Sequence, residues 1–384
     1  MSQPRHSPSP LKPLRRSVMA LWLALVTPHA WSAGNSVAPT ITEPTAEFVY
    51  KYLLGEVAAQ RGEFALAGQL FLDLAKQTRN PSLAERATQA STLSRAPQLA
   101  LPSASLWAEL APQSPQAQEA ASQLYIANND LKRATPYIEK VLANPIIRPN
   151  AFMELNALMV RIKDKAQVLE TIRQLAEPYP DLPEAKLAIA QAAFFARDEA
   201  TMQQSLDAAA SLRKGWEPPA QMRGQLLAEK SPPQAIDFYR DFLRSYPNAD
   251  QIRLALARTL LVQKDTAGAK IEFTKLLEKH RDNADMNVIV GLLALDAKEY
   301  AFADRYLQHA LELGFKDPNK LLLNLGRSAA EQHDDTRALE WYSQIGEGDQ
   351  YLASKLAAAG ILARRDGVDA AIAMLDNVDG LTPE

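Results

Sequence analysis

Residues 320–342 read KLLLNLGRSAAEQHDDTRALEWY, and this stretch decides the fold. Apolar residues recur every three or four positions on both sides of a turn signal at residues 333–335, which predicts two antiparallel helices. Ala338 follows Leu325 by thirteen residues and precedes Tyr342 by four. Where two helices cross closely, a Gly or Ala on one must meet a large side chain on the other. We therefore expect the pair to cross near Ala338.

The same pattern recurs along the chain at intervals of 32 to 35 residues. In every unit the residues thirteen before and four after the small position are apolar. Such a period predicts an array of about ten helix-turn-helix units, because one unit cannot bury its apolar faces alone and stacked neighbours must supply the core. The small positions, two of which hold larger residues, are Ala67, Ala100, Ala134, Val168, Met202, Ala235, Ala269, Ala303, Ala338 and Ala370.

These units resemble the tetratricopeptide repeat (TPR) family, whose signature combines a Leu-Gly pair, a small residue and an aromatic residue. The resemblance covers roughly residues 48–380 and implies an all-α, TPR-type α-solenoid of about ten units in a right-handed superhelix. Units two, four and five diverge, and units four and five have Val168 and Met202 at the small position. The residues that carry the resemblance are Leu54, Gly55, Ala67 and Phe71 in unit one and Leu325, Gly326, Ala338 and Tyr342 in unit nine.

Residues 1–32 have the order of a secretory signal peptide. Four basic residues and no acidic residue are followed by an apolar run at 18–26 and a small-residue zone at 30–34. This order predicts a periplasmic protein. An uncleaved membrane anchor is the weaker alternative, because the run is about half the roughly 20 residues that a spanning helix needs. Residues 33–47 are interpreted as a flexible leader, and residues 381–384 as a tail.

Composition excludes several classes of site and partner. The chain of 384 residues has no Cys, so disulfides, thiolate zinc sites, cysteine nucleophiles and a lipid-bearing amino-terminal Cys are all excluded. Its formal charge is −3, and it becomes −7 once the four positive charges of residues 1–32 are removed. Nucleic acid and anionic membranes bind positive surfaces. We therefore expect protein or peptide partners, with no nucleic acid and no lipid anchor.

The sequence offers no sign of catalysis. His280, His309 and His333 fall in three different units, at spacings that match no metal motif. Phosphate-binding glycine loops and nucleophile motifs are also absent from the sequence. We therefore predict a protein that is not an enzyme, with no catalytic residue, no metal and no cofactor.

The TPR resemblance implies that the first helix of each unit lines the concave face. Mapped onto units seven to nine, it predicts an apolar strip edged by two arginines. We expect the strip to bind an extended or helical polypeptide, with acidic groups or a carboxyl terminus near Arg258 and Arg327. The alternative is that the solenoid or further repeats fill the strip. Its residues are Leu254, Arg258, Leu261, Val288, Leu292, Leu295, Leu323 and Arg327.

The favoured function is a non-enzymatic periplasmic scaffold or adaptor that organises protein partners. The divergent second unit and the long array resemble bacterial envelope adaptors that present substrates to carboxyl-terminal processing proteases. Two alternatives stay open. One is an assembly factor for outer-membrane or cell-wall machinery, and the other, less favoured, is a helical envelope enzyme acting on glycan.

Unit ten finishes at residues 381–384, where another unit would begin. Solenoids normally need a capping element with a polar outer face, and we expect Leu352, Leu356 and Ile361 to lie at or near an open end. Three outcomes follow as expectations: a truncated array, self-association through the last unit, or residues after 377 folding back.

Overall fold

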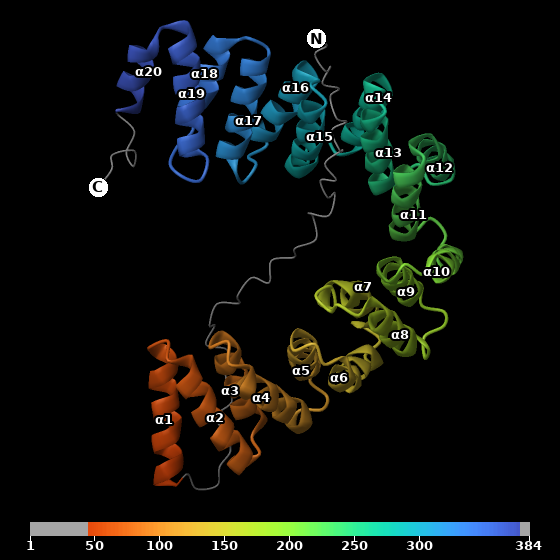
Figure 1. Ribbon diagram of the computed structural model, residues 1–384, viewed down its shortest axis with the longest axis vertical. Helices are drawn as coiled ribbons and strands as arrows, with labels where there is room; N and C mark the ends of the chain where they lie inside the picture. The colour runs from red at the N-terminus through yellow and green to blue at the C-terminus, as the bar shows by residue number, and fades with distance from the viewer. Residues whose placement is uncertain (1–44, 377–384) are drawn as a thin grey trace, which may run out of the picture. The chain divides into compact units, whose positions relative to one another are not determined.

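The computed structural model describes residues 45–376, and every regular element in that range is an α-helix (Figure 1). The chain forms two compact units that meet in sequence between Leu212 and Arg213. The first unit holds α1 (Ala46–Gln60), α2 (Phe64–Thr78), α3 (Pro81–Leu93), α4 (Pro97–Leu110), α5 (Pro115–Ala127), α6 (Leu131–Ala143), α7 (Arg148–Leu158), α8 (Lys165–Ala176), α9 (Pro183–Ala196) and α10 (Glu199–Leu212). The second holds α11 (Glu217–Lys230), α12 (Pro232–Ser245), α13 (Asp250–Val262), α14 (Thr266–Lys279), α15 (Ala284–Asp296), α16 (Tyr300–Glu312), α17 (Pro318–Glu331), α18 (Asp335–Ser343), α19 (Tyr351–Arg365) and α20 (Val368–Leu375).

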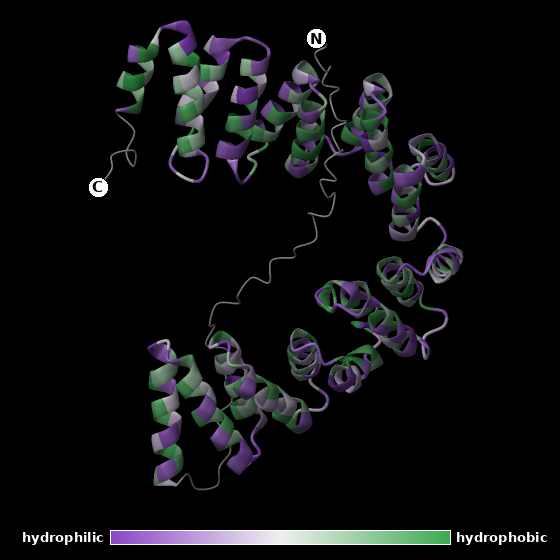
Figure 2. Ribbon diagram, in the orientation of Figure 1, coloured by the Kyte–Doolittle hydropathy of each residue, from purple (hydrophilic) through white to green (hydrophobic). Residues whose placement is uncertain are grey.

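The predicted repeat is confirmed within residues 45–376, where the helices follow one another as ten pairs. Each predicted small position lies on the second helix of its pair. All are buried except Ala370, which is half-buried in the last pair. Prolines start many of the helices, where the missing N–H has no intrahelical partner to lose. Figure 2 shows hydrophilic residues gathered at the turns between helices.

Close crossing of the two helices depends on glycine in several pairs. A Cβ placed on Gly55 of α1 would lie 2.9 Å from Cε1 of Phe71 on α2. On Gly291 of α15 it would lie 2.7 Å from Cδ2 of Leu307 on α16. Contacts this short force a neighbour to move, so glycine is what lets the large side chain pack against the first helix.

The turns inside several pairs repeat one local device. A residue in the left-handed region is followed by an aspartate that caps the second helix. Asn129 has a φ of 61° and Asp130 accepts a hydrogen bond from the backbone N–H of Arg133. His333 has a φ of 60° and Asp334 accepts from the backbone N–H of Arg337. These caps satisfy helix N–H groups that otherwise lack partners.

Units four and five handle their larger residues differently. In unit four, with Val168 at the small position, α7 makes its close backbone approach to α9 instead of to α8. A branched side chain at the crossing point keeps two helix backbones apart. In unit five Met202 is buried, yet α9 and α10 pack closely. Here α9 supplies the small side chains, with Ala188, Ala192 and Ala193 all buried.

Some predictions fall at the ends of the described range. The predicted signal peptide, nearly all of the leader and the tail at 381–384 lie outside the described residues. The first helix starts at Ala46, two residues before the predicted start, because Thr45 caps it by accepting from the N–H of Phe48. Over residues 45–376, no helix combines the length and the apolar character that crossing a membrane requires.

Of the three apolar residues expected at an open end of the array, two are exposed in the last helix pair and one is buried. Leu352 and Leu356 are 45% and 52% exposed. Ile361 is 4% exposed, so its predicted position at the end is wrong. It packs instead into the core that α17, α18 and α19 share, next to Ala338 and Tyr342.

Candidate functional site

The eight residues of the predicted strip, called here the first-helix strip, lie on α13, α15 and α17 in the second compact unit. The structure divides their apolar side chains among separate hydrophobic clusters. Leu254 and Leu261 pack with the core of α12 to α14. Val288 and Leu292 pack together in a second cluster, and Leu323 belongs to a third. The apolar members therefore do not form one continuous cluster.

Burial narrows the surface that the strip offers. Leu254, Val288 and Leu323 are only 5%, 6% and 7% exposed. All three occupy the position fifteen residues before the small residue, so this position is used for packing between helices in three successive units. The accessible part of the strip is formed by the two arginines, which are exposed, and by three half-buried leucines: Leu261, Leu292 and Leu295.

Arg258 and Arg327 occupy the same position, eleven residues before the small residue, in units seven and nine. Each side chain is exposed and has no ion-pair or hydrogen-bond partner within residues 45–376. Burial of the surrounding surface lowers the pKa of Arg258, which still remains charged at any physiological pH. Leu292 occupies the equivalent position in unit eight. Two unpaired positive charges thus mark the accessible face of the first helices.

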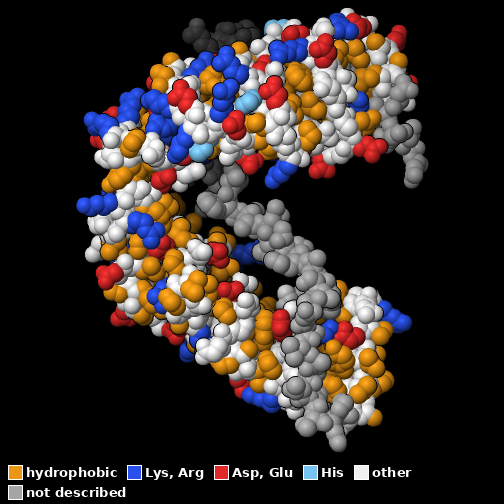
Figure 3. Space-filling model, turned by 180° about the vertical axis from the view of Figure 1, so that it is seen from behind, with side chains coloured by type: hydrophobic (Ala, Val, Ile, Leu, Met, Phe, Trp, Pro, Cys, Tyr) orange, Lys and Arg blue, Asp and Glu red, His pale blue; other side chains and the backbone are white. Residues whose placement is uncertain are grey.

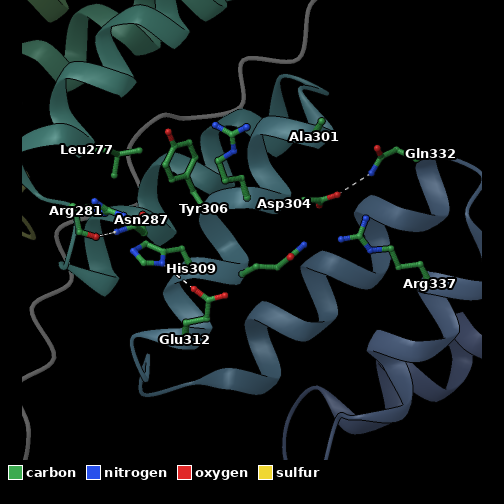
Figure 4. Close-up of a pocket in the computed structure, with 12 residues that line it drawn as sticks. Leu277, Arg281, Asn287, Ala301, Asp304, Tyr306, His309, Glu312, Gln332 and Arg337 are labelled. Atoms are coloured by element: carbon green, nitrogen blue, oxygen red, sulfur yellow. Dashed lines mark hydrogen bonds and ion pairs between the residues drawn. The ribbon is translucent and has the colours of Figure 1, made fainter.

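A second candidate site lies on the second helices of units seven to nine, outside the first-helix strip. It is a pocket of about 620 Å³ between α14, α16 and α18, also bounded by residues of α15 and by Gln332 at the end of α17 (Figure 4). Three arginines line it: Arg281 before α15, Arg305 on α16 and Arg337 on α18. None of the three guanidinium groups has a carboxylate partner in the part of the chain that the structure describes.

In two side chains of the pocket wall, Asp304 and His309, one polar atom is hydrogen-bonded and the other is not. Asp304 is 7% exposed, and its Oδ2 accepts a hydrogen bond of 3.1 Å from Nε2 of Gln332. Its Oδ1 is buried without a hydrogen-bond partner among the described residues. His309 donates from Nδ1 to Oε2 of Glu312 over 3.0 Å, since an ionised carboxylate only accepts. The Nε2 of His309 is likewise buried and unpartnered.

The balance of charge in the pocket wall is positive. Three arginines face two carboxylates, and one of those, on Glu312, is already bonded to His309. Figure 3 shows Lys and Arg side chains gathered on the surface of the second unit. The arrangement favours an anionic group, because unpaired guanidinium groups bind carboxylate and phosphate through two parallel N–H donors.

This pocket was not predicted from the sequence, although the spacing of polar residues on α16 points to it. Arg305, Gln308 and Glu312 follow one another at spacings of three and four, which places them on one helix face beside His309. A polar helix face is usually only solvated, so the pattern alone did not identify a site. No three His, Asp or Glu side chains gather as potential metal ligands in residues 45–376.

Comparison with known proteins finds a similarity to one protein family over part of the chain. Residues 226–289 match the family model described as tetratricopeptide repeat. A TPR repeat-containing protein of Pseudomonas aeruginosa is 29% identical over 340 residues, which cover 88% of this chain and 57% of that protein. The chain thus spans little more than half the length of this relative.

Two solved structures were also found to be similar. The crystal structure of PilW, a widely conserved type IV pilus biogenesis factor, matches with a TM-score of 0.39 and 17% identity over 52% of this chain and 92% of PilW. The crystal structure of yeast Tom70 matches with a TM-score of 0.41 and 10% identity over 88% of this chain and 92% of Tom70.

Proposed function

Because the chain carries tetratricopeptide repeats, we propose that it is a non-enzymatic scaffold of the bacterial cell envelope that binds protein or peptide partners along its first helices. The observation that carries this proposal is the pair Arg258 and Arg327. Both are exposed, charged and unpaired within the described residues, at equivalent positions two units apart. A charge left without an internal partner on a rigid helix is available to an acidic group of a partner.

The half-buried leucines between these arginines supply the apolar part of the same surface. Leu261, Leu292 and Leu295 are partly covered by neighbouring helices, and their remaining surface is open to a bound chain. A short apolar stretch flanked by cations suits a segment that carries leucine-like side chains and acidic residues. Leu254 is buried in the cluster against which Leu261 packs, and Val288 is buried in the cluster against which Leu292 packs.

The proposed location is the periplasm, and the proposed role is that of an adaptor. The location rests on the order of basic, apolar and small residues in 1–32. The adaptor role, presenting substrates to a carboxyl-terminal processing protease, rests on the resemblance of the repeat array to such envelope proteins. A scaffold needs no catalytic group of its own, since its contribution is to hold partners at one place.

Quantitative pull-down from envelope extracts tests the proposal. The chain and its Arg258→Glu/Arg327→Glu variant are immobilised at equal helical content, with Arg240→Glu as a control of exposed charge on α12. We expect a set of envelope proteins, including a processing protease, to bind the chain and the control and to be depleted on the double variant. Equal recovery on all three proteins would exclude the first-helix strip as the binding surface.

The identity of the captured proteins distinguishes the adaptor from the alternatives. Recovery of outer-membrane or cell-wall assembly proteins without a protease would replace the adaptor role by an assembly role. Hydrolysis of purified glycan by the chain alone would overturn the non-enzymatic proposal altogether.

A further inference from the structure

We propose that the pocket between α14, α16 and α18 is a second binding site, which takes a carboxylate-bearing segment of an acidic peptide. The site is distinct from the first-helix strip, because Arg258 and Arg327 are not among its lining residues. It therefore goes beyond the proposed function and gives the array a separate contact on its second helices.

The arginines of the pocket come from three successive repeats. Arg305 lies on α16 and Arg337 on α18, so helix packing sets the spacing of these two residues, and Arg281 joins them from the short turn between α14 and α15. Each is unpaired within the described residues. Elsewhere in the same compact unit Arg253, whose side chain is only 12% exposed, pairs with Glu272 over 2.6 Å. Arg281 and Arg305 are exposed and Arg337 is half-buried, so their charges are accessible to an anion that a ligand brings.

The buried polar atoms of the wall indicate what else the ligand carries. A buried acceptor without a donor is unfavourable, and more so when the group is charged. Oδ1 of Asp304 is such an acceptor, in a side chain that Gln332 fixes from the other side. Nε2 of His309 is another polar atom without a partner. The wall thus offers places for hydrogen-bond donors as well as for negative charge.

A peptide fits both features better than inorganic phosphate does. Carboxylates of an acidic peptide pair with the arginines, while its backbone N–H groups are donors for Asp304 and His309. Phosphate at neutral pH presents mainly acceptor oxygens, which would face the carboxylate of Asp304 unfavourably. The volume of about 620 Å³ lies within the range of roughly 300–1,000 Å³ that ligand pockets occupy.

Fluorescence anisotropy with a fluorescein-labelled decapeptide of alternating Glu and Gly tests the proposal on the full chain. We expect Arg305→Glu/Arg337→Glu to weaken binding at least tenfold. Arg240→Glu, which changes an exposed arginine on α12 by the same charge as each of the two pocket substitutions, is expected to change binding less than twofold. Circular dichroism checks that all variants keep their helical content. Should the double variant unfold, the single variants Arg305→Gln and Arg337→Gln replace it, with an expected loss of about threefold each.

Two results would overturn the proposal. Equal weakening by Arg240→Glu and by the pocket variants would show that the peptide responds to overall charge. Displacement of the peptide by inorganic phosphate, at concentrations whose ionic strength alone does not weaken peptide binding, would assign the pocket to phosphate. Arg337→Lys keeps the positive charge, and we expect its affinity to lie between those of Arg337→Gln and the unaltered chain, because lysine cannot form the two parallel hydrogen bonds.

Discussion

Arg86 on α3 in the first compact unit and Arg258 on α13 in the second are both arginines of a first helix, but their surroundings differ. Arg86 forms an ion pair with Glu56, donates to Oη of Tyr52 over 3.0 Å and lies over the ring of Phe71. Arg258 has no such partner in the described residues and keeps its charge at the surface. The same helix-pair geometry thus serves internal packing in one region and leaves charge available in the other.

The difference shows that backbone geometry and surface chemistry vary independently along a repeat array. In the first compact unit Gly55 meets Phe71 at a helix crossing, and in the second compact unit Gly326 meets Tyr342 at the equivalent crossing. The charged groups around these crossings are nevertheless used differently. A binding surface is therefore identified by the polar groups that packing leaves unpaired, and not by the repeat signature.

The largest expected effect tests what the two regions share. Gly326→Ala places a methyl group against the ring of Tyr342, and we expect it to lower the free energy of unfolding by about 2 kcal/mol. Gly360→Ala in the same compact unit is the matched control, because a Cβ on Gly360 would meet nothing within 4 Å. It is expected to stabilise by roughly 0.5–1 kcal/mol through helix propensity. Urea unfolding followed by circular dichroism measures both, and equal effects would refute the close-crossing account.

A second prediction tests the difference between the regions. Arg86→Ala removes the partner of Glu56, whose side chain is 23% exposed, and we expect a loss of about 2 kcal/mol in stability. Arg258→Ala is expected to change stability by less than about 0.5 kcal/mol, since no partner is lost. Thermal unfolding of the two variants provides the comparison. A larger loss for Arg258→Ala would mean that this arginine is structural.

A third prediction concerns pH. Burial alone would raise the pKa of Asp250, but hydrogen bonds from Lys279 and His280 outweigh it and hold the pKa below its ordinary 3.8. The folded state therefore gains stability above the unfolded pKa and loses it as the pH falls through the lower, folded pKa. Asp250→Asn is expected to cost about 1 kcal/mol at pH 7, and this cost should shrink as the pH is lowered below about 4. Urea unfolding at pH 7 and at acid pH measures it. A cost independent of pH would contradict the assignment.

The smallest effect concerns turn conformation. Lys298, between α15 and α16, has a φ of 61°, which costs a residue with a Cβ about 1 kcal/mol. Lys298→Gly relieves this strain while adding freedom to the unfolded chain, and we expect a net gain of roughly 0.3 kcal/mol. Thermal unfolding detects it as a small rise in midpoint. The same change at exposed Lys320, inside α17, should instead destabilise by about 1 kcal/mol.

The repeat and its crossing points could be predicted from the sequence, because both depend on residues within one period. Ala338 and Tyr342 are four residues apart on one helix, and the helix that they meet comes less than twenty residues earlier. Burial of Leu254, Val288 and Leu323 was not predictable in this way. It depends on how each first helix meets the adjoining units, and the TPR resemblance alone placed these side chains on an open face.

The pocket was beyond sequence reasoning for a related reason. Its arginines at 281, 305 and 337 belong to different repeats, so no local spacing brings them together. Only packing of consecutive pairs does so. The unpaired state of Arg327 is also a property of the fold, since Glu331 follows it by four residues on the same helix and yet does not pair with it in the described residues.

The packing of α7 against α9 limits where the first compact unit can be cut. Because α7 makes its close backbone approach to α9, unit four borrows part of its support from unit five. A cut between α8 and α9 would follow the sequence period, but it would separate α7 from α9, the helix that it packs against most closely. The boundary between units four and five is therefore an unsafe place to cut this protein, because both α7 and α8 pack against α9 across it.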